Sequence, residues 1–143
     1  LSLPVSTLAG VAGAPAAVPL IVAPVVKLLI PASPLAYVVV FTLLAPLALY
    51  RGPLNVWGMG LGLAEVIRSA GSLGAPLVMG MLQSVGQVQG ICDPTNTANI
   101  WIAGHARVTT RRILVKTLPY ALALACAGLV LASLTFRHEF ARP

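Results

Sequence analysis

The chain has 143 residues, of which 58% are hydrophobic and only 8% are charged, and its mean hydropathy is +0.94. This composition is typical of a protein embedded in a lipid bilayer and excludes an ordinary soluble domain. The net charge of +6 comes from basic residues that lie between apolar blocks without any nucleic-acid-binding motif, which favours contact with anionic lipid and excludes nucleic acid as a partner.

The length sets how much of a membrane protein the chain can form. A spanning helix needs about 20 apolar residues, so 143 residues allow roughly three to five membrane segments in a single domain. The chain starts Leu1-Ser2-Leu3-Pro4, without an initiator methionine or the charged start of a signal peptide. We therefore expect it to be part of a longer protein.

Two apolar blocks come first. Residues 8–30 predict a membrane helix that is kinked or broken, because three prolines interrupt it and each removes a backbone hydrogen bond. Residues 34–50 predict a cleaner spanning helix. Tyr37 and Tyr50 lie near its ends, where aromatic side chains favour the boundary between membrane and water.

Residues 54–68 predict a short helix with charge near its end. Gly58 and Gly62 form a small-xxx-small pair that would let another helix approach closely. Glu65 and Arg68 are three residues apart on one helical face and can pair. This pair is either a structural contact at an interface or a gating or proton-relay pair.

Residues 71–104 combine two short apolar arms with a polar run, from Gln83 to Asn99, between them. Each arm is too short to cross a bilayer alone. Irregular, amide-rich backbone is tolerated within lipid only where protein or trapped water satisfies its hydrogen bonds. The pattern predicts a re-entrant hairpin, in which one half-helix enters the membrane, the polar run forms a tip and a short arm returns.

Residues 113–136 predict the clearest spanning helix, and a basic loop precedes it. The positive-inside bias places this loop in the cytoplasm and the C-terminus outside. Arg51 and Arg68 fall on the same inner side if residues 52–68 lie along the membrane surface. We therefore expect a multi-pass protein of the cell inner membrane, with four cationic residues in its inner loop: Arg107, Arg111, Arg112 and Lys116.

The polar tip holds the groups best suited to bind a solute. Pro94 disfavours helical backbone at Asp93, which leaves local carbonyl groups free of helix bonds. Hydroxyl and amide oxygens are hard neutral ligands suited to Na⁺, and the N–H groups of a helix that starts after the tip can face a carboxylate. Ser84, Gln87 and Gln89 add polar groups from the entry arm. The tip itself supplies four such residues: Thr95, Asn96, Thr97 and Asn99.

Asp93 is the only acid in the presumed membrane core, which makes it a candidate proton carrier or cation ligand. The alternative is that the tip is an ordinary water-exposed loop, in which Asp93 caps the next helix. Cys92 beside it is either a small buried thiol or a reactive one. Because the two cysteines form no cluster with histidine, we expect no metal site, and no cofactor beyond Na⁺ or H⁺ as a coupling ion.

The order of a glycine-rich apolar arm, a Gln-rich segment, a tip with Thr95-Asn96-Thr97, a return arm and a final spanning helix resembles the C-terminal repeat of ion-transporter superfamily carriers. The citrate, gluconate and dicarboxylate permeases belong to that superfamily. The resemblance implies two inverted repeats, each with a hairpin tip whose Ser-Asn-Thr-type motif binds carboxylate and coupling ion. Here Thr replaces Ser, and Asp93-Pro94 departs from the sodium-coupled pattern, which points to protons. The resemblance covers residues 54–136.

We therefore expect residues 1–143 to form an all-α integral membrane domain, one repeat of an inverted-repeat secondary transporter that moves a small organic anion with H⁺ or Na⁺. Its expected partners are the lipid bilayer, the anion, and the remaining half of the transporter or another copy of the chain. The alternative is a small non-transporting membrane subunit that scaffolds a larger complex, with Gly58 and Gly62 at its interface. The sequence has no GxSxG or HExxH motif and no carboxylate pair beside a nucleophile, so we do not expect an enzyme.

Overall fold

The computed structural model describes residues 31, 33–69 and 73–141, and the predicted kinked helix over residues 8–30 lies outside the described residues. The described part is all-helical and contains no strand, which confirms the predicted all-α class. In chain order its elements are α2 (Pro34–Leu44), the 3₁₀ helix η2 (Ala45–Arg51), α3 (Gly60–Ser69), α4 (Ala75–Cys92), α5 (Thr97–Ala106), α6 (Thr110–Thr135) and the 3₁₀ helix η3 (Arg137–Ala141).

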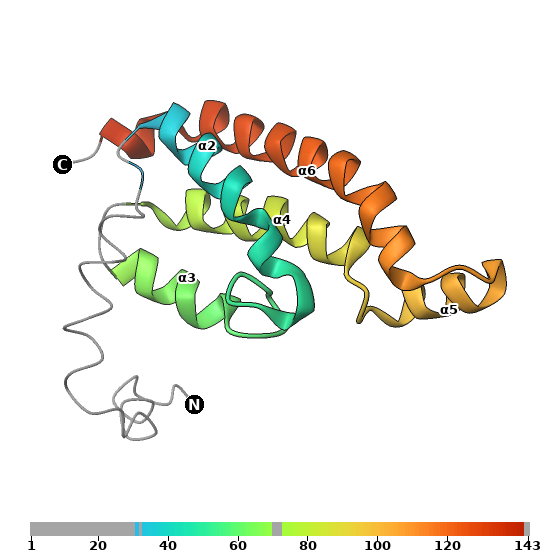
Figure 1. Ribbon diagram of the computed structural model, residues 1–143. Coiled ribbons are helices and arrows are strands. Elements are labelled where there is room, and N and C mark those ends of the chain that lie inside the picture. Colours follow the sequence, from blue (N-terminus) through green and yellow to red (C-terminus); the bar gives the residue numbers. More distant parts are fainter. Residues whose placement is uncertain (1–30, 32, 70–72, 142–143) are drawn as a thin grey trace, which may run out of the picture.

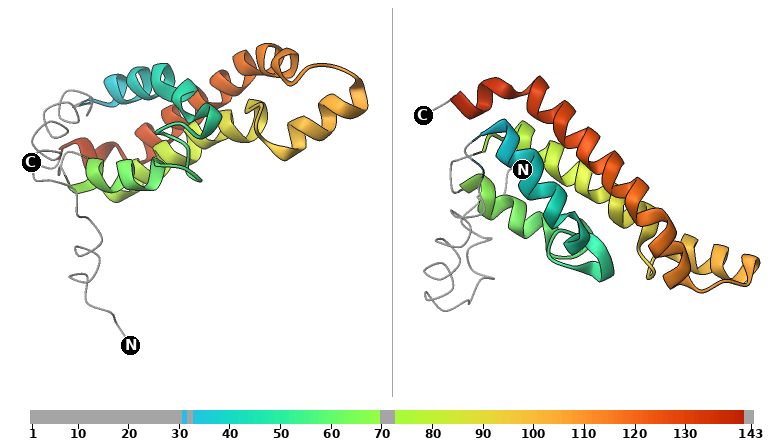
Figure 2. Two further views of the ribbon diagram at one scale, coloured as in Figure 1. Left: turned by 60° about the horizontal axis from the view of Figure 1, so that its bottom comes forward. Right: turned by 45° about the horizontal axis from the view of Figure 1, so that its top comes forward.

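Helix α4 is the central element, and α2, α3 and α6 surround it (Figure 1). Helices α2 and α4 run in one direction, and α3 and α6 run in the other. Helix α5 projects beyond the end of α4, away from the rest of the bundle, in all three ribbon views (Figures 1 and 2).

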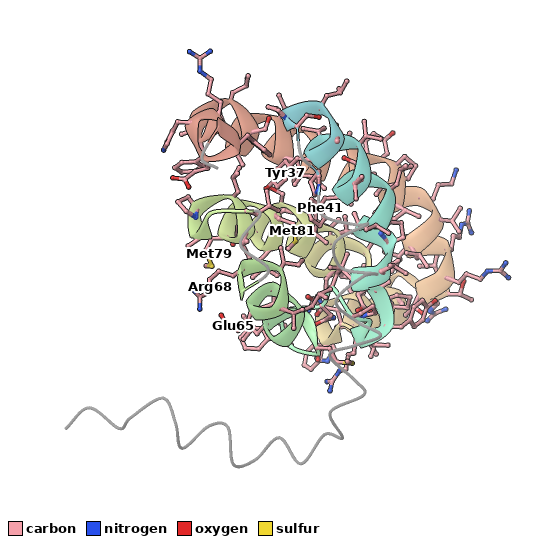
Figure 3. The ribbon with its side chains drawn as sticks, turned by 90° about the vertical axis from the view of Figure 1, so that its left-hand side faces the viewer. Tyr37, Phe41, Glu65, Arg68, Met79 and Met81 are labelled. Carbon is pink, nitrogen blue, oxygen red and sulfur yellow. The ribbon has the colours of Figure 1, made fainter. Side chains whose placement is uncertain are left out.

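One long-range hydrogen bond joins α2 to α4, and it comes from a pair of buried aromatic side chains on α2. Tyr37 and Phe41 are fully buried, and their rings meet edge to face with centroids 5.2 Å apart. The Tyr37 hydroxyl donates to the Leu77 carbonyl oxygen of α4 at 2.7 Å. Figure 3 shows Tyr37, Phe41 and Met81 in the interior between the helices. This contact fixes the position of α2 on α4.

Small residues allow α4 and α6 to pack closely. A Cβ atom added at Gly80 would lie 2.7 Å from the Ala132 Cβ, and one added at Gly128 would lie 2.6 Å from the Ser84 hydroxyl oxygen. Three buried residues of α6 continue the same face one turn apart: Ala121, Ala125 and Leu129. Because the helix backbones approach at these positions, the interface resembles the small-residue contacts typical of membrane helices.

The predicted helix over residues 34–50 is α-helical only as far as Leu44. The N–H of Ala45 bonds to the Thr42 carbonyl in the tighter 3₁₀ pattern, and Pro46 has no N–H with which to continue the α-helix. The backbone then enters the left-handed region at Tyr50 and Arg51, with φ of 53° and 57°. The chain therefore turns sharply at residues 50–51, before the segment that leads to α3.

The predicted short helix over residues 54–68 starts later, at Gly60. A tight turn comes first, in which the N–H groups of Gly58 and Gly60 both donate to the Asn55 carbonyl. Gly58 therefore lies outside α3 and does not share a helical face with Gly62. No described atom lies within 4 Å of a Cβ placed at Gly62, so this glycine is not required by the packing of the described residues.

The re-entrant hairpin predicted over residues 71–104 is not confirmed, and neither is an inverted repeat. Helix α4 continues through the Gln-rich segment to Cys92, because glutamine is a good helix former, and Pro94 ends it. Irregular backbone is limited to residues 93–96. Helix α5 then runs onward from α4 instead of folding back, and α6 is the antiparallel neighbour of α4 (Figures 1 and 2). The segment is an interrupted helix.

Two described helices are long and apolar enough to cross a membrane: residues Pro34–Arg51, with mean hydropathy 1.6, and Thr110–Thr135, with mean hydropathy 1.9. Only 28% and 17% of their most apolar windows are buried within the fold. Leu35, Leu43 and Leu131 are among the large apolar side chains that point outward. Helices with such exposed apolar faces suit a lipid environment.

Candidate functional site

The interruption between α4 and α5 is organised around the Asp93 carboxylate, which is only 2% exposed. Its Oδ1 accepts hydrogen bonds from the Thr95 N–H at 2.8 Å and from the Thr95 hydroxyl at 2.7 Å. Its Oδ2 accepts one from the Tyr50 N–H at 3.1 Å. Asp93 therefore joins the interrupted helix to the strained turn at the end of η2, 43 residues earlier in the chain.

Two asparagines satisfy the backbone around the interruption. Asn96 caps α5 through a bond from the Ala98 N–H to its Oδ1, and its Nδ2 donates to the Gly90 carbonyl at 3.0 Å. The buried Asn99 amide donates to the carbonyls of Ile91 and Asp93, at 3.1 and 2.9 Å. These carbonyls, which the sequence suggested were available to a solute, are thus bound by side-chain amides. The cap of α5 is Asn96 and not Asp93.

The segment that follows η2 is fixed by Asn55, whose side chain is fully buried. Its Nδ2 donates to the Ala48 carbonyl at 3.0 Å, and its Oδ1 accepts from the Trp57 N–H at 2.8 Å. A buried amide with both ends bonded holds a loop in one conformation, since breaking either bond would leave a buried polar group unsatisfied. Residues 51–57 therefore form a defined wall opposite the interruption.

An open pocket of about 270 Å³ lies between these two segments. This volume is slightly below the range of about 300–1,000 Å³ that is usual for ligand sites, so it has room for a small solute only. Its lining is mainly polar and comes from both segments: Arg51, Asn55 and Trp57 from the loop, and Gln89, Gly90, Asp93, Thr95, Asn96 and Thr97 from the interruption.

The structure brings together most of the site residues that the sequence suggested. Asp93, Thr95, Asn96 and Thr97 line the pocket, and Asn99, which does not line it, bonds to the interrupted backbone. Gln89, one of the polar residues that the sequence suggested on the entry arm, also lines the pocket. The pocket contains four residues that sequence reasoning missed: Arg51, Asn55, Trp57 and Gly90. The sequence marks the wall at residues 51–57 only by the Gly52-Pro53 pair, which predicts a turn, and by Asn55, a polar residue in an apolar region.

Ser84 and Gln87 do not line the pocket. The Ser84 hydroxyl donates to the Gly80 carbonyl at 2.7 Å and packs against Gly128 of α6. The Gln87 amide bonds to the Gln83 carbonyl of its own helix, at 3.5 Å. Because the Gln-rich segment is helical, the geometry of α4 sets the direction of the Ser84 and Gln87 side chains. They therefore do not point into the predicted tip.

Two other polar features lie apart from the pocket. Glu65 and Arg68 pair at 2.9 Å on an exposed face of α3 (Figure 3), and this hydrogen bond holds the pKa of the Glu65 carboxyl below its usual value. Cys92 is buried, and its thiol donates to the Val88 carbonyl at 2.9 Å. Among the described residues, no three His, Cys, Asp or Glu side chains gather closely enough to hold a metal ion.

The pocket is the feature of the described chain whose chemistry bears most directly on function. Its walls offer hydroxyl, amide and guanidinium groups in a chain of strongly apolar composition. Comparison of the sequence and the structure with protein-family models, with curated proteins and with solved structures gives no match.

Proposed function

We propose that the chain is part of a secondary transporter that moves a small organic anion of the citrate, gluconate or dicarboxylate type across the cell inner membrane, coupled to H⁺ or Na⁺. The observation that carries this proposal is the polar pocket between the interrupted helix α4–α5 and the loop at residues 51–57. Carriers commonly bind solutes where membrane helices are interrupted, because the unwound backbone and the new helix end supply polar groups inside an apolar protein.

The composition supports this reading over a soluble binding protein. Only 28% and 17% of the most apolar windows of the two candidate spans are buried within the described fold, which is unfavourable in water and favourable in lipid. In such a setting, a buried acid and a group of hydroxyls and amides are costly to keep, and they commonly mark a solute or ion pathway. The polar lining of the pocket thus contrasts with the apolar composition of the chain, as we expect of a transport site.

Five residues at the interruption have proposed roles. Thr95, Asn96 and Thr97 contact the solute, and Asn99 keeps the interrupted backbone in place. Asp93 is the proposed coupling residue, because its bond to the Tyr50 N–H links the two walls of the pocket. Ser84 and Gln87 lie outside the lining and are not part of the proposed binding set.

Uptake by proteoliposomes that contain the full-length protein tests the proposal. Radiolabelled citrate, gluconate and succinate are each supplied with an imposed H⁺ or Na⁺ gradient. We expect Asn96→Ala and Thr97→Val to abolish or strongly reduce uptake, while both variants insert in the membrane as the wild type does. Gln87→Ala is the matched control, because Gln87 lies on α4 but outside the pocket, and it should retain full uptake.

Full uptake by Asn96→Ala together with Thr97→Val would refute the assignment of the pocket. If the wild-type protein shows no uptake and none of the three anions raises its melting temperature in detergent, the chain is not a carrier. A non-transporting membrane subunit that scaffolds a larger complex would then account for its composition.

A further inference from the structure

Arg51 supplies the only positive charge among the described residues that line the pocket. Its side chain is exposed, and within the described part of the chain it takes part in no ion pair or hydrogen bond. The other charged lining residue, Asp93, is 2% exposed, and both of its oxygens accept bonds from Thr95 or Tyr50. The charge available to a solute in the pocket is therefore that of the guanidinium.

The backbone at Arg51 is also unusual. Tyr50 and Arg51 are consecutive non-glycine residues with positive φ, a conformation that such residues rarely adopt. One hydrogen bond holds the turn, because the Asp93 carboxylate accepts the Tyr50 N–H. The Gly58 backbone also passes close to the turn, so that a Cβ added at Gly58 would lie 2.9 Å from the Arg51 carbonyl oxygen. Strained backbone that is held this firmly is characteristic of functional sites, where it fixes the position of a side chain.

From the pocket, the available charge and the strained turn we infer that Arg51 binds a carboxylate group of the transported anion. This inference rests on the proposed function and adds a specificity-determining residue to it. The planar guanidinium can donate two parallel hydrogen bonds to a carboxylate, a geometry that lysine cannot reproduce. The neutral amides and hydroxyls of Asn96 and Thr97 form the opposite wall and are suited to the remaining polar groups of the solute.

The test uses the full-length protein in proteoliposomes and three variants. Arg51→Gln removes the charge, Arg51→Lys keeps the charge without the fork, and Arg111→Gln is the control. Arg111 is an exposed arginine of α6 that does not line this pocket. The probes are citrate, gluconate and succinate, with glucose as an uncharged relative of gluconate, and the readouts are the KM and maximal rate of uptake and the shift in melting temperature in detergent.

We expect Arg51→Gln to raise the KM for the transported anion roughly tenfold or more, the effect of losing one hydrogen bond to a charged group. The maximal rate and the amount of inserted protein should stay near the wild-type values. The variant should also lose the discrimination between gluconate and glucose. The KM of Arg51→Lys should fall between those of Arg51→Gln and the wild type, and Arg111→Gln should behave as the wild type.

Three outcomes would contradict the inference. They differ in whether they also refute the proposed transport function. An unchanged KM in Arg51→Gln, with active wild-type protein, removes the role of Arg51 and leaves the proposed transport function standing. An equal rise in KM for Arg111→Gln and Arg51→Gln would show a general effect of charge near the membrane surface. Absence of both uptake and thermal stabilisation by the anions in the wild type would remove the proposed function itself.

Discussion

Asp93 connects two parts of the chain that are distant in sequence. Its Oδ1 organises the local turn through Thr95, and its Oδ2 holds the Tyr50 N–H in the strained turn that precedes the loop at residues 51–57. A buried carboxylate that accepts three hydrogen bonds is costly to alter, because each abandoned donor loses its partner without regaining water. The position of one wall of the pocket relative to the other therefore depends on this side chain.

Replacing Asp93 by Asn separates these two roles. The Asn Oδ1 can still accept both bonds from Thr95, but its Nδ2 would present a donor to the Tyr50 N–H. We expect a loss of about 1 to 3 kcal/mol of stability, the usual cost of an unsatisfied buried group. Hydrogen–deuterium exchange should also become faster at residues 48–58, while exchange at residues 97–106 stays as in the wild type.

Glu65→Gln provides the matched control, because it removes an acid from an exposed pair on α3. Its melting temperature in detergent should not change measurably, since exposed ion pairs contribute little. Equal exchange rates at residues 48–58 in Asp93→Asn and the wild type would show that the Tyr50 bond does not hold the turn.

The residues of the pocket could be predicted from the sequence only on one wall. Thr95, Asn96 and Thr97 follow Asp93-Pro94 directly, so a local reading of turn and cap chemistry finds them. Arg51 and Asn55 lie about 40 residues earlier, and only the packing of η2 against α4 brings them to the same place. No local pattern specifies that contact, so sequence reasoning missed the second wall.

At the scale of elements, the contact between α4 and α6 determines the arrangement of the bundle. Ser84 faces Gly128, and Gly80 faces Ala132, so that at both levels at least one partner is a glycine. In a membrane, helices gain little from the hydrophobic effect, and close van der Waals packing of small residues takes its place. Side-chain volume at these positions should therefore control the stability of the fold.

Gly128→Leu tests this expectation. Even the Cβ of the new side chain would lie 2.6 Å from the Ser84 hydroxyl oxygen, so α4 and α6 must move apart. We expect a loss of about 3 kcal/mol, the upper end of the usual cost of overpacking, measured as a lower melting temperature or easier unfolding in denaturing detergent.

Two further variants make the result specific to the interface. Gly104→Leu, in α5, places its Cβ where no described atom lies within 4 Å, and it should leave stability unchanged or slightly higher because leucine is the better helix former. Adding Ser84→Gly to Gly128→Leu should restore part of the loss. Equal destabilisation by Gly128→Leu and Gly104→Leu would show that the effect comes from the helix and not from the contact.

The sequence predicts a hairpin where the structure has an interrupted helix, and the reason is the Gln-rich segment. By apolar length alone, the glutamines from Gln83 to Gln89 make the first arm look too short to span the bilayer. Helix propensity depends on backbone and side-chain entropy and not on polarity, so a Gln-rich segment continues a helix easily. The true end is set by Pro94, which the sequence did reveal.

At the scale of the whole molecule, the charged residues that the structure describes are divided unequally between the two ends of the bundle. Arg51 lies at the C-terminal end of α4, together with the basic loop and the start of α6: Arg107, Arg111, Arg112 and Lys116. Arg68 packs beside Ala75 at the opposite end of α4, so it does not share a side with Arg51 as the sequence suggested. At that opposite end, Arg68 and Arg137 are accompanied by Glu65 and Glu139.

This asymmetry predicts the orientation in the membrane, because the end richer in lysine and arginine stays in the cytoplasm. In a protein whose native cysteines, Cys92 and Cys126 among them, are replaced by alanine, single cysteines at Ala106 and Thr135 report on the two ends, since both positions are exposed and uncharged. A membrane-impermeant thiol reagent added to intact cells should label the cysteine at position 135 and spare the one at 106. Both should react after the membrane is permeabilised. Labelling at 106 and not at 135 would reverse the orientation, whereas labelling at both positions in intact cells would show that α6 does not cross the membrane.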